Sequence, residues 1–103
     1  MATKNYLGKT IEITDEGYLV NPNDWTPEIA KEIAKEDGLT LSDKHLAILN
    51  YMRQKHEKGE TLTIRAISKS GIVDIKGFYE LFPGAPLKLA SKIAGLPKPS
   101  SCV

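Results

Sequence analysis

The strongest constraint on the fold of this chain is a helix-start signal that recurs along most of its length. The first copy is Thr26 followed by Pro27, a capping side chain placed before a residue that suits the first helical position. Three further capping residues each follow an apolar residue that is placed to pack against the new helix: Ser42, Thr63 and Asp74. These signals predict helices that begin near residues 27, 43, 63 and 74.

Glycine residues predict where the helices end, because glycine is favoured directly after the last helical turn. The stops, in chain order, are Gly38, Gly59, Gly71, Gly84 and Gly95. Together with Pro86 in the first turn of a last helix, they predict helices over about 27–37, 43–58, 63–69, 74–82 and 86–94.

Apolar residues of the longest expected helix recur at helical spacing, which indicates one buried face. Tyr51 and Met52 fall on this stripe, so we interpret them as core residues rather than as ligands. Leu62 is similarly placed to pack against Ile67 across the start of the third helix.

The N-terminal part alternates β-branched and polar residues around a turn at residues 15–17. This pattern predicts a hairpin that pairs residues 10–14 with residues 18–20 and lies on the helices. The expected fold class is therefore mostly α: a small orthogonal bundle of about five helices with an N-terminal β-hairpin and a flexible C-terminal arm. We expect a helical domain over residues 1–95 and a mobile arm over residues 96–103.

Length and composition are typical of one small globular domain, with 103 residues, 41% hydrophobic and 26% charged. No stretch has the length of a membrane span and the N-terminus lacks a signal-peptide pattern, so we expect a cytoplasmic protein. The charge is uneven: residues 1–51 carry −4 and residues 52–103 carry +5. This asymmetry is either incidental or suited to an acidic or anionic partner.

The C-terminal segment reads as an arm that carries the only cysteine of the chain. Gly95 ends the last helix, and Pro97 and Pro99 favour an extended course beyond it. Cys102 is the penultimate residue, at a reach of about 20 Å from the helix end when the segment is extended. The arm therefore presents a thiol at its tip.

This half of the chain contains two distinctive motifs, Tyr-Glu-Leu-Phe-Pro-Gly at residues 79–84 and Lys-Ile-Ala-Gly-Leu-Pro-Lys-Pro at residues 92–99, followed by the penultimate cysteine. They resemble motifs of the DsrC/TusE family of sulfur-relay proteins, also called the sulfite reductase gamma subunit family. A looser resemblance extends over nearly the whole chain, including Trp25 and Arg65. The resemblance implies a small, mostly helical, cytoplasmic protein in which Cys102 carries sulfur as a persulfide or a related adduct.

One position departs from the family branch that works with dissimilatory sulfite reductase. That branch has a second cysteine eleven positions before the penultimate one, where this chain has Ser91. Without a second thiol, intramolecular disulfide or trisulfide chemistry cannot be completed, so the chain looks more like the TusE branch, which passes sulfur towards tRNA thiolation. Whether Ser91 is native or an engineered replacement of cysteine stays open, and a role as gamma-subunit partner of dissimilatory sulfite reductase is the first alternative.

The chemistry expected of Cys102 is thiol exchange, which depends on the thiolate fraction and on access. Lys98 and Lys92 favour the thiolate, whereas the terminal carboxylate of Val103 opposes it. We expect activation to come mainly from the pocket of a partner, that is, from sulfur-donor and sulfur-acceptor proteins of a relay. The sequence indicates a carrier that needs no cofactor, and it leaves sulfurtransferase activity open.

Basic residues of the third and fourth helices are candidates for docking the arm or guiding an anionic sulfur group. With the two lysines near the C-terminus, the set is Arg65, Lys69, Lys76, Lys92 and Lys98. The docking role is implied by the resemblance, and the alternative is ordinary surface charge.

A third function belongs to another class, a helix-turn-helix module that binds nucleic acid through the third and fourth helices. The weak basic character counts against it, and so do Phe78, Tyr79, Leu81 and Phe82, which we expect in the core. No metal site is expected, because His45 and His56 lie about 16 Å apart on one helix. We expect both histidines to be solvated or partly packed.

Overall fold

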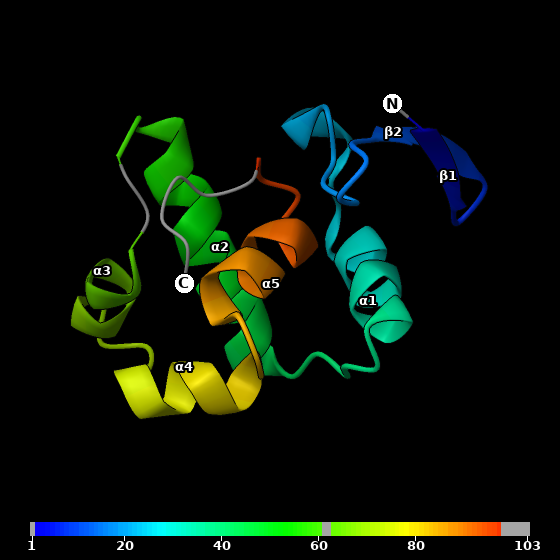
Figure 1. Ribbon diagram of the computed structural model, residues 1–103. Coiled ribbons are helices and arrows are strands. Elements are labelled where there is room, and N and C mark those ends of the chain that lie inside the picture. The colour runs from blue at the N-terminus through cyan, green and yellow to red at the C-terminus, as the bar shows by residue number, and fades with distance from the viewer. Residues whose placement is uncertain (1, 61–62, 98–103) are drawn as a thin grey trace.

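The computed structural model describes residues 2–60 and 63–97, in which a hairpin precedes five helices (Figure 1). The strands are β1 (Ala2–Tyr6) and β2 (Lys9–Ile13), and a short 3-10 helix, η1, covers Pro22–Asp24. The α-helices are α1 (Pro27–Glu36), α2 (Asp43–Glu57), α3 (Ile64–Lys69), α4 (Ile75–Leu81) and α5 (Pro86–Ile93). The expected mostly helical fold class is confirmed.

The helix starts lie where the capping residues predicted them. Thr26 Oγ1 accepts a hydrogen bond from the Ile29 N–H group, and Pro27 occupies the first helical position. The other side-chain caps are Ser42, Thr63 and Asp74, each of which accepts from the backbone three residues further on. These contacts satisfy N–H groups that the helices themselves leave free.

The N-terminal hairpin is present, but its main partner differs from the prediction. β2 pairs antiparallel with β1, in a register that runs from Ala2 opposite Ile13 to Tyr6 opposite Lys9. The segment expected to pair, residues 18–20, contributes one isolated bridge, Ile13 to Leu19. The physical reason is a two-residue turn at residues 7 and 8, both with positive φ, which suits a hairpin and closes β1 onto β2.

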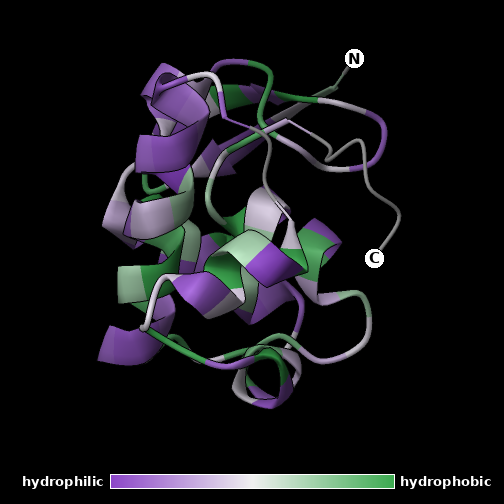
Figure 2. Ribbon diagram, turned by 90° about the vertical axis from the view of Figure 1, so that its left-hand side faces the viewer, coloured by the Kyte–Doolittle hydropathy of each residue, from purple (hydrophilic) through white to green (hydrophobic). Residues whose placement is uncertain are grey.

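The core surrounds α5, which contacts α1, α2 and α4, while α3 packs on α4. In Figure 1, α5 lies in the middle of the molecule, with α1 and α3 on opposite sides of it. Its buried side chains include Leu87, Ala90 and Ile93, all without exposed area. Figure 2 shows hydrophobic and hydrophilic residues alternating along the helices, as expected for helices with one buried face.

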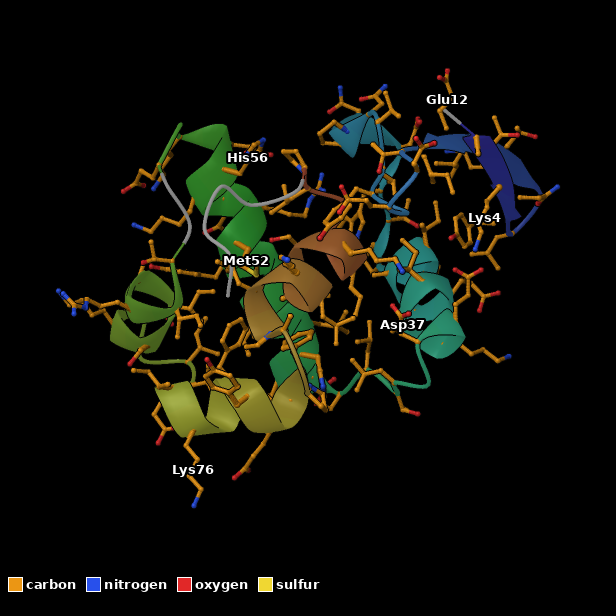
Figure 3. All side chains as sticks on the ribbon, in the orientation of Figure 1. Lys4, Glu12, Asp37, Met52, His56 and Lys76 are labelled. Atoms are coloured by element: carbon orange, nitrogen blue, oxygen red, sulfur yellow. The ribbon has the colours of Figure 1, made fainter. Side chains whose placement is uncertain are left out.

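The interpretation of Tyr51 and Met52 as core residues agrees with the structure. Met52 is fully buried and lies among the helices in Figure 3, and Tyr51 is partly buried against the core. The expected contact from Leu62 lies outside the described residues. In the described part of the chain, no helix is long and apolar enough to cross a membrane.

Candidate functional site

The C-terminal end of α5 is the last described structure before the cysteine. The Gly95 N–H group donates to the Lys92 carbonyl (3.2 Å), and the Leu96 N–H group donates to the Ser91 carbonyl (3.0 Å). This pair of hydrogen bonds is a Schellman motif, which requires the left-handed backbone seen at Gly95, with φ +71°. Leu96 is 2% exposed, so the chain leaves the core at Pro97, which is exposed.

Two side chains from distant parts of the sequence hold the last carbonyls of this helix. The Trp25 Nε1–H group donates to the Ile93 carbonyl (2.7 Å). Arg53, on α2, donates from Nη1 to the Ala94 carbonyl (2.7 Å) and from Nη2 to the Pro22 carbonyl (3.0 Å). Its guanidinium carbon lies over the Trp25 ring, 4.3 Å from the ring centroid. These contacts fix the last turn of α5 in place.

The guanidinium of Arg53 is partly shielded from water. Desolvation by burial lowers the pKa of Arg53, and the charge of Glu57 acts in the opposite direction. Among the described residues, no carboxylate lies within ion-pair distance of the guanidinium. Its partners are two carbonyls and an aromatic face, which are typical contacts of an arginine that fixes geometry.

Cys102 and Lys98, the predicted sulfur-bearing residue and its neighbouring cation, lie outside the described residues. Their roles therefore stay predictions. What the structure supplies is the base from which their segment starts, at Leu96 and Pro97.

Ser91, at the position of the absent second cysteine, faces the core. Its side chain is 1% exposed, and its Oγ atom has no hydrogen-bond partner among the described residues. A buried hydroxyl cannot replace a thiol in persulfide exchange, because the exchange requires attack by a thiolate. Position 91 thus contributes to packing in this chain.

Three of the predicted basic residues are exposed. Arg65 and Lys69 lie on α3, and Lys76 lies on α4, where Figure 3 shows it pointing away from the body. Lys92 lies elsewhere: it pairs with Asp37 after α1, at 3.3 Å. The structure therefore brings Arg65 and Lys69 together on one helix but places Lys92 on the side of α1.

Lys92 has surroundings that the sequence did not indicate. Its side chain packs on Gly17, where an added Cβ atom would lie 3.0 Å from the lysine Cε atom. It also lines a surface hollow together with Tyr18, Asp37 and Lys88. The lysine thus ties α5 to the turn that follows β2 and to the end of α1.

The two helices of the helix-turn-helix alternative are joined through a glycine, Gly71, with φ +82°. The inner face of α4 is buried through Phe78, with Phe82 after it, as expected. Tyr79 differs from the expectation, because it is 42% exposed on the outer face. An expected core residue therefore lies at the surface of α4, because successive helical positions are rotated by about 100° and Phe78 is the buried one.

His45 differs from the expectation of a solvated or partly packed side chain, whereas His56 is exposed. His45 is buried, and its Nδ1 atom accepts a hydrogen bond from the Ser42 N–H group at 3.0 Å. Nδ1 therefore carries no proton, and Nε2 donates to the Leu81 carbonyl at 2.9 Å. The sequence signal for this role was the histidine three residues after the cap. The described residues hold no cluster of three or more metal-ligand side chains.

The sequence pointed to Trp25 only through a resemblance and did not indicate Arg53 as a site residue. Trp25 is the only tryptophan of the chain, which was a usable signal. For Arg53 the sequence carried none, because its partner carbonyls lie 41 and 31 positions away.

The fold and this helix end define a small helical domain whose last helix is held at a fixed point just before a cysteine-bearing terminus. The family model described as "DsrC like protein" matches residues 5–103. The chain belongs to the DsrC family, as the motifs indicated.

Relatives carry the names of both family branches. The chain is 37% identical over 105 residues to "Sulfite reductase, dissimilatory-type subunit gamma" of Nitratidesulfovibrio vulgaris, with 100% of both chains covered. It is 40% identical over 105 residues to "Sulfurtransferase TusE" of Buchnera aphidicola, covering 94% of this chain and 92% of the relative. The NMR structure of Allochromatium vinosum DsrC superposes with a TM-score of 0.84 at 38% identity, over 98% of this chain and 97% of that one.

Proposed function

We propose that this protein is a sulfur carrier that accepts and donates persulfide sulfur at Cys102. The observation that carries the proposal is membership of a family whose named relatives include sulfurtransferases, in a chain with one penultimate cysteine. The fixed end of α5 supports it, because it provides a rigid base for the segment that bears the thiol. We place the carrier in the cytoplasm, where reducing conditions keep a lone thiol free.

The transfer is a thiol–disulfide type exchange in both directions. The Cys102 thiolate attacks the outer sulfur of a donor persulfide; a bond forms between Cys102 Sγ and that sulfur, while the donor S–S bond breaks and the donor leaves as a thiolate. The electron pair of the broken bond stays with the donor, so no external oxidant or reductant is needed. An acceptor thiolate repeats the step on the Cys102 persulfide and restores the free cysteine.

Within the family, we propose a TusE-like relay that leads towards tRNA thiolation. Ser91 supports this branch, because a chain without a second thiol cannot close an internal disulfide on Cys102. Relay proteins are then the partners: one donor that carries a persulfide and one acceptor with a reactive thiol.

A second candidate is the gamma-subunit partner of dissimilatory sulfite reductase. The full-length match to a protein of that name favours it. Co-purification of this chain with the reductase, and sulfite-dependent loading of Cys102 in the complex, would support this role. Loading by relay donors alone would support the TusE-like role instead.

The proposal is tested by mass spectrometry of the intact protein and of its C-terminal peptide after incubation with inorganic polysulfide. We expect added sulfur on the terminal peptide that a reductant removes, and none on a Cys102→Ser variant. Labelling by a standard thiol reagent is the control for access. If that reagent modifies Cys102 readily while polysulfide leaves it unmodified, the carrier proposal is wrong.

The basic residues enter as guides for an anionic persulfide or for the arm: Arg65, Lys69, Lys76, Lys92 and Lys98. The exposure of Arg65, Lys69 and Lys76 supports this role, because they are free to meet a partner. An Arg65→Ala variant is expected to transfer sulfur more slowly at low salt, where surface charge acts most strongly. An unchanged transfer rate would remove Arg65 from the proposal.

A further inference from the structure

Arg53 is a half-buried cation that the sulfur exchange at Cys102 does not itself use. Its two Nη atoms reach the Ala94 and Pro22 carbonyls at 2.7 and 3.0 Å. These carbonyls belong to the last turn before the C-terminal segment and to the short η1 helix. The guanidinium therefore joins α2, η1 and the end of α5 at one point.

An arginine is the side chain that suits this geometry. Its planar fork reaches two acceptors at once while its face stacks on Trp25, 4.3 Å from the ring centroid. A lysine has a single ammonium group and cannot span both carbonyls and the ring. For stability alone, an apolar residue at position 53 would avoid the desolvation that lowers the pKa of Arg53.

The contacts converge on the residues that start the arm. Ala94 is the C-cap of α5, Gly95 is pressed against Trp25, and Leu96 is buried. An added Cβ atom at Gly95 would lie 2.6 Å from Trp25 Cδ1, so the indole and this backbone are in direct contact. The point and direction at which the chain leaves the core are thus set by Arg53 and Trp25 together.

We propose that Arg53 is a positioning residue for sulfur transfer, which holds the base of the C-terminal arm so that Cys102 is presented from one fixed point. This inference rests on the proposed function, since it concerns delivery of the sulfur that Cys102 carries. The Cα atom of Cys102 lies at most about 20 Å from that of Leu96, six residues at roughly 3.3 Å each. The position of Leu96 therefore limits how far from the end of α5 the thiol can lie.

Loss of this contact has a calculable consequence. If Ala94, Gly95 and Leu96 are released, about nine residues instead of about six connect Cys102 to the last fixed residue of the core. The r.m.s. span of a flexible segment scales with the square root of its length, so it increases by about one fifth. A wider search lowers the effective concentration of the thiol at a docked partner.

The chain offers its own distance probe, because it has one tryptophan and one cysteine. The experiment measures energy transfer from Trp25 to a dansyl-type acceptor attached to Cys102, with time-resolved fluorescence. Wild type, Arg53→Gln and Arg53→Lys are compared, and each unlabelled variant supplies its own donor lifetime. Tyr51→Phe is the matched control, because it removes a hydrogen bond from the same helix to the Ala66 carbonyl.

We expect a broader distribution of Trp25-to-label distances in Arg53→Gln, with an r.m.s. distance greater than that of wild type by up to about one fifth. Arg53→Lys is expected to broaden it less, and Tyr51→Phe is expected to match wild type. An unchanged distribution in folded Arg53→Gln would overturn the proposal. If that variant does not fold, an unchanged distribution in Arg53→Lys would overturn it equally.

Sulfur uptake from inorganic polysulfide separates this inference from the proposed function. A small donor diffuses to the thiol, so uptake at Cys102 is expected to be equal in wild type and in both Arg53 variants. A wild type that takes up no sulfur contradicts the carrier function, whatever the distances show. Normal uptake with unchanged distances contradicts only the positioning role of Arg53.

Discussion

At the scale of single residues, Gly95 is constrained twice. Its backbone is left-handed, with φ +71°, and the Trp25 ring occupies the space that a side chain would need. Gly59 ends α2 with φ +75° but has open space around it. The two glycines therefore separate the backbone requirement from the packing requirement.

Replacement of Gly95 by alanine is expected to lower the free energy of unfolding by roughly 2–4 kcal/mol, because left-handed strain and overpacking against Trp25 add. Gly59→Ala, the matched control, is expected to cost about 1 kcal/mol, from strain alone. Urea denaturation of both variants measures the difference. Equal losses would show that the indole moves aside without cost.

The buried hydroxyl of Ser91 contributes little to the stability of the fold. A buried hydroxyl without a partner loses its hydrogen bonds to water on folding, so Ser91→Ala is expected to leave stability unchanged or raise it by about 1 kcal/mol. Ser70→Ala is the control and is expected to destabilise the fold, because Ser70 Oγ donates a hydrogen bond to the Ile67 carbonyl and accepts one from the Ile72 N–H group. Thermal melts compare the two. A clear loss of thermal stability in Ser91→Ala would contradict the interpretation that this hydroxyl has no hydrogen-bond partner.

At the scale of elements, His45 links the start of α2 to the end of α4. Its ring accepts a hydrogen bond from the Ser42 N–H group and donates one to the Leu81 carbonyl. It also packs edge-on against the Phe82 ring, with the two ring centroids 5.1 Å apart. These contacts place α4 relative to α2 although the two helices are separated by α3. The residue is therefore an interlock between elements rather than a candidate ligand.

Replacing His45 with alanine is expected to cost about 2–4 kcal/mol, because two buried hydrogen bonds and a ring contact are lost. His56→Ala, on the exposed end of the same helix, is the control and is expected to change stability by less than about 0.5 kcal/mol. Denaturation in urea provides the comparison. Similar small losses in both variants would mean that α4 is held by its apolar face alone.

The helix boundaries and the hairpin show what local sequence predicts at this scale. Caps such as Thr26 act on groups three residues away, so they are visible in the sequence itself. The predicted partner of β2 was wrong, because two turns are placed to close a hairpin on this strand. One lies before it, at residues 7–8, and the other lies after it, at residues 15–17. The alternation pattern is the same for either partner, so it fixes the strand but not its neighbour.

At the scale of the whole molecule, a polar network ties the hairpin to α1. Tyr6 Oη donates to Glu36 Oε1 at 2.9 Å, and Lys4 Nζ lies 2.7 Å from Glu36 Oε2. Burial, then the hydrogen bond to Glu36 and the acidic charges, raise the pKa of Tyr6. Partial burial acts to raise the pKa of Glu36, but its hydrogen bonds from Lys4 and Tyr6 and nearby positive charge hold it below its ordinary value.

The two shifts act at opposite ends of the pH range. The raised pKa of Tyr6 contributes stability that is present below about pH 10 and is lost as pH rises further, because the unfolded chain ionises first. The lowered pKa of Glu36 contributes stability that is present above about pH 4.3 and is lost as pH falls. Between these limits the network adds stability that changes little with pH.

Tyr6→Phe is expected to be less stable than wild type near neutral pH by about 1 kcal/mol, the net value of one hydrogen bond. Above about pH 10 the two stability curves are expected to converge, since the variant has no phenol to ionise. Urea denaturation from pH 6 upwards measures this. Stability curves that stay parallel at alkaline pH would show that ionisation of Tyr6 does not cause the loss of stability there.

The sequence by itself determined the helices, their starts and stops, the presence of a hairpin, the family, and the cysteine proposed to carry sulfur. All of these depend on neighbours within a few positions or on motifs read directly. Only the tertiary structure decided how the end of α5 is held, because Arg53 and Trp25 meet Ala94 and Ile93 across 41 and 68 positions. Contacts over such separations leave no local pattern, so they exist only once the core has brought α2, η1 and α5 together.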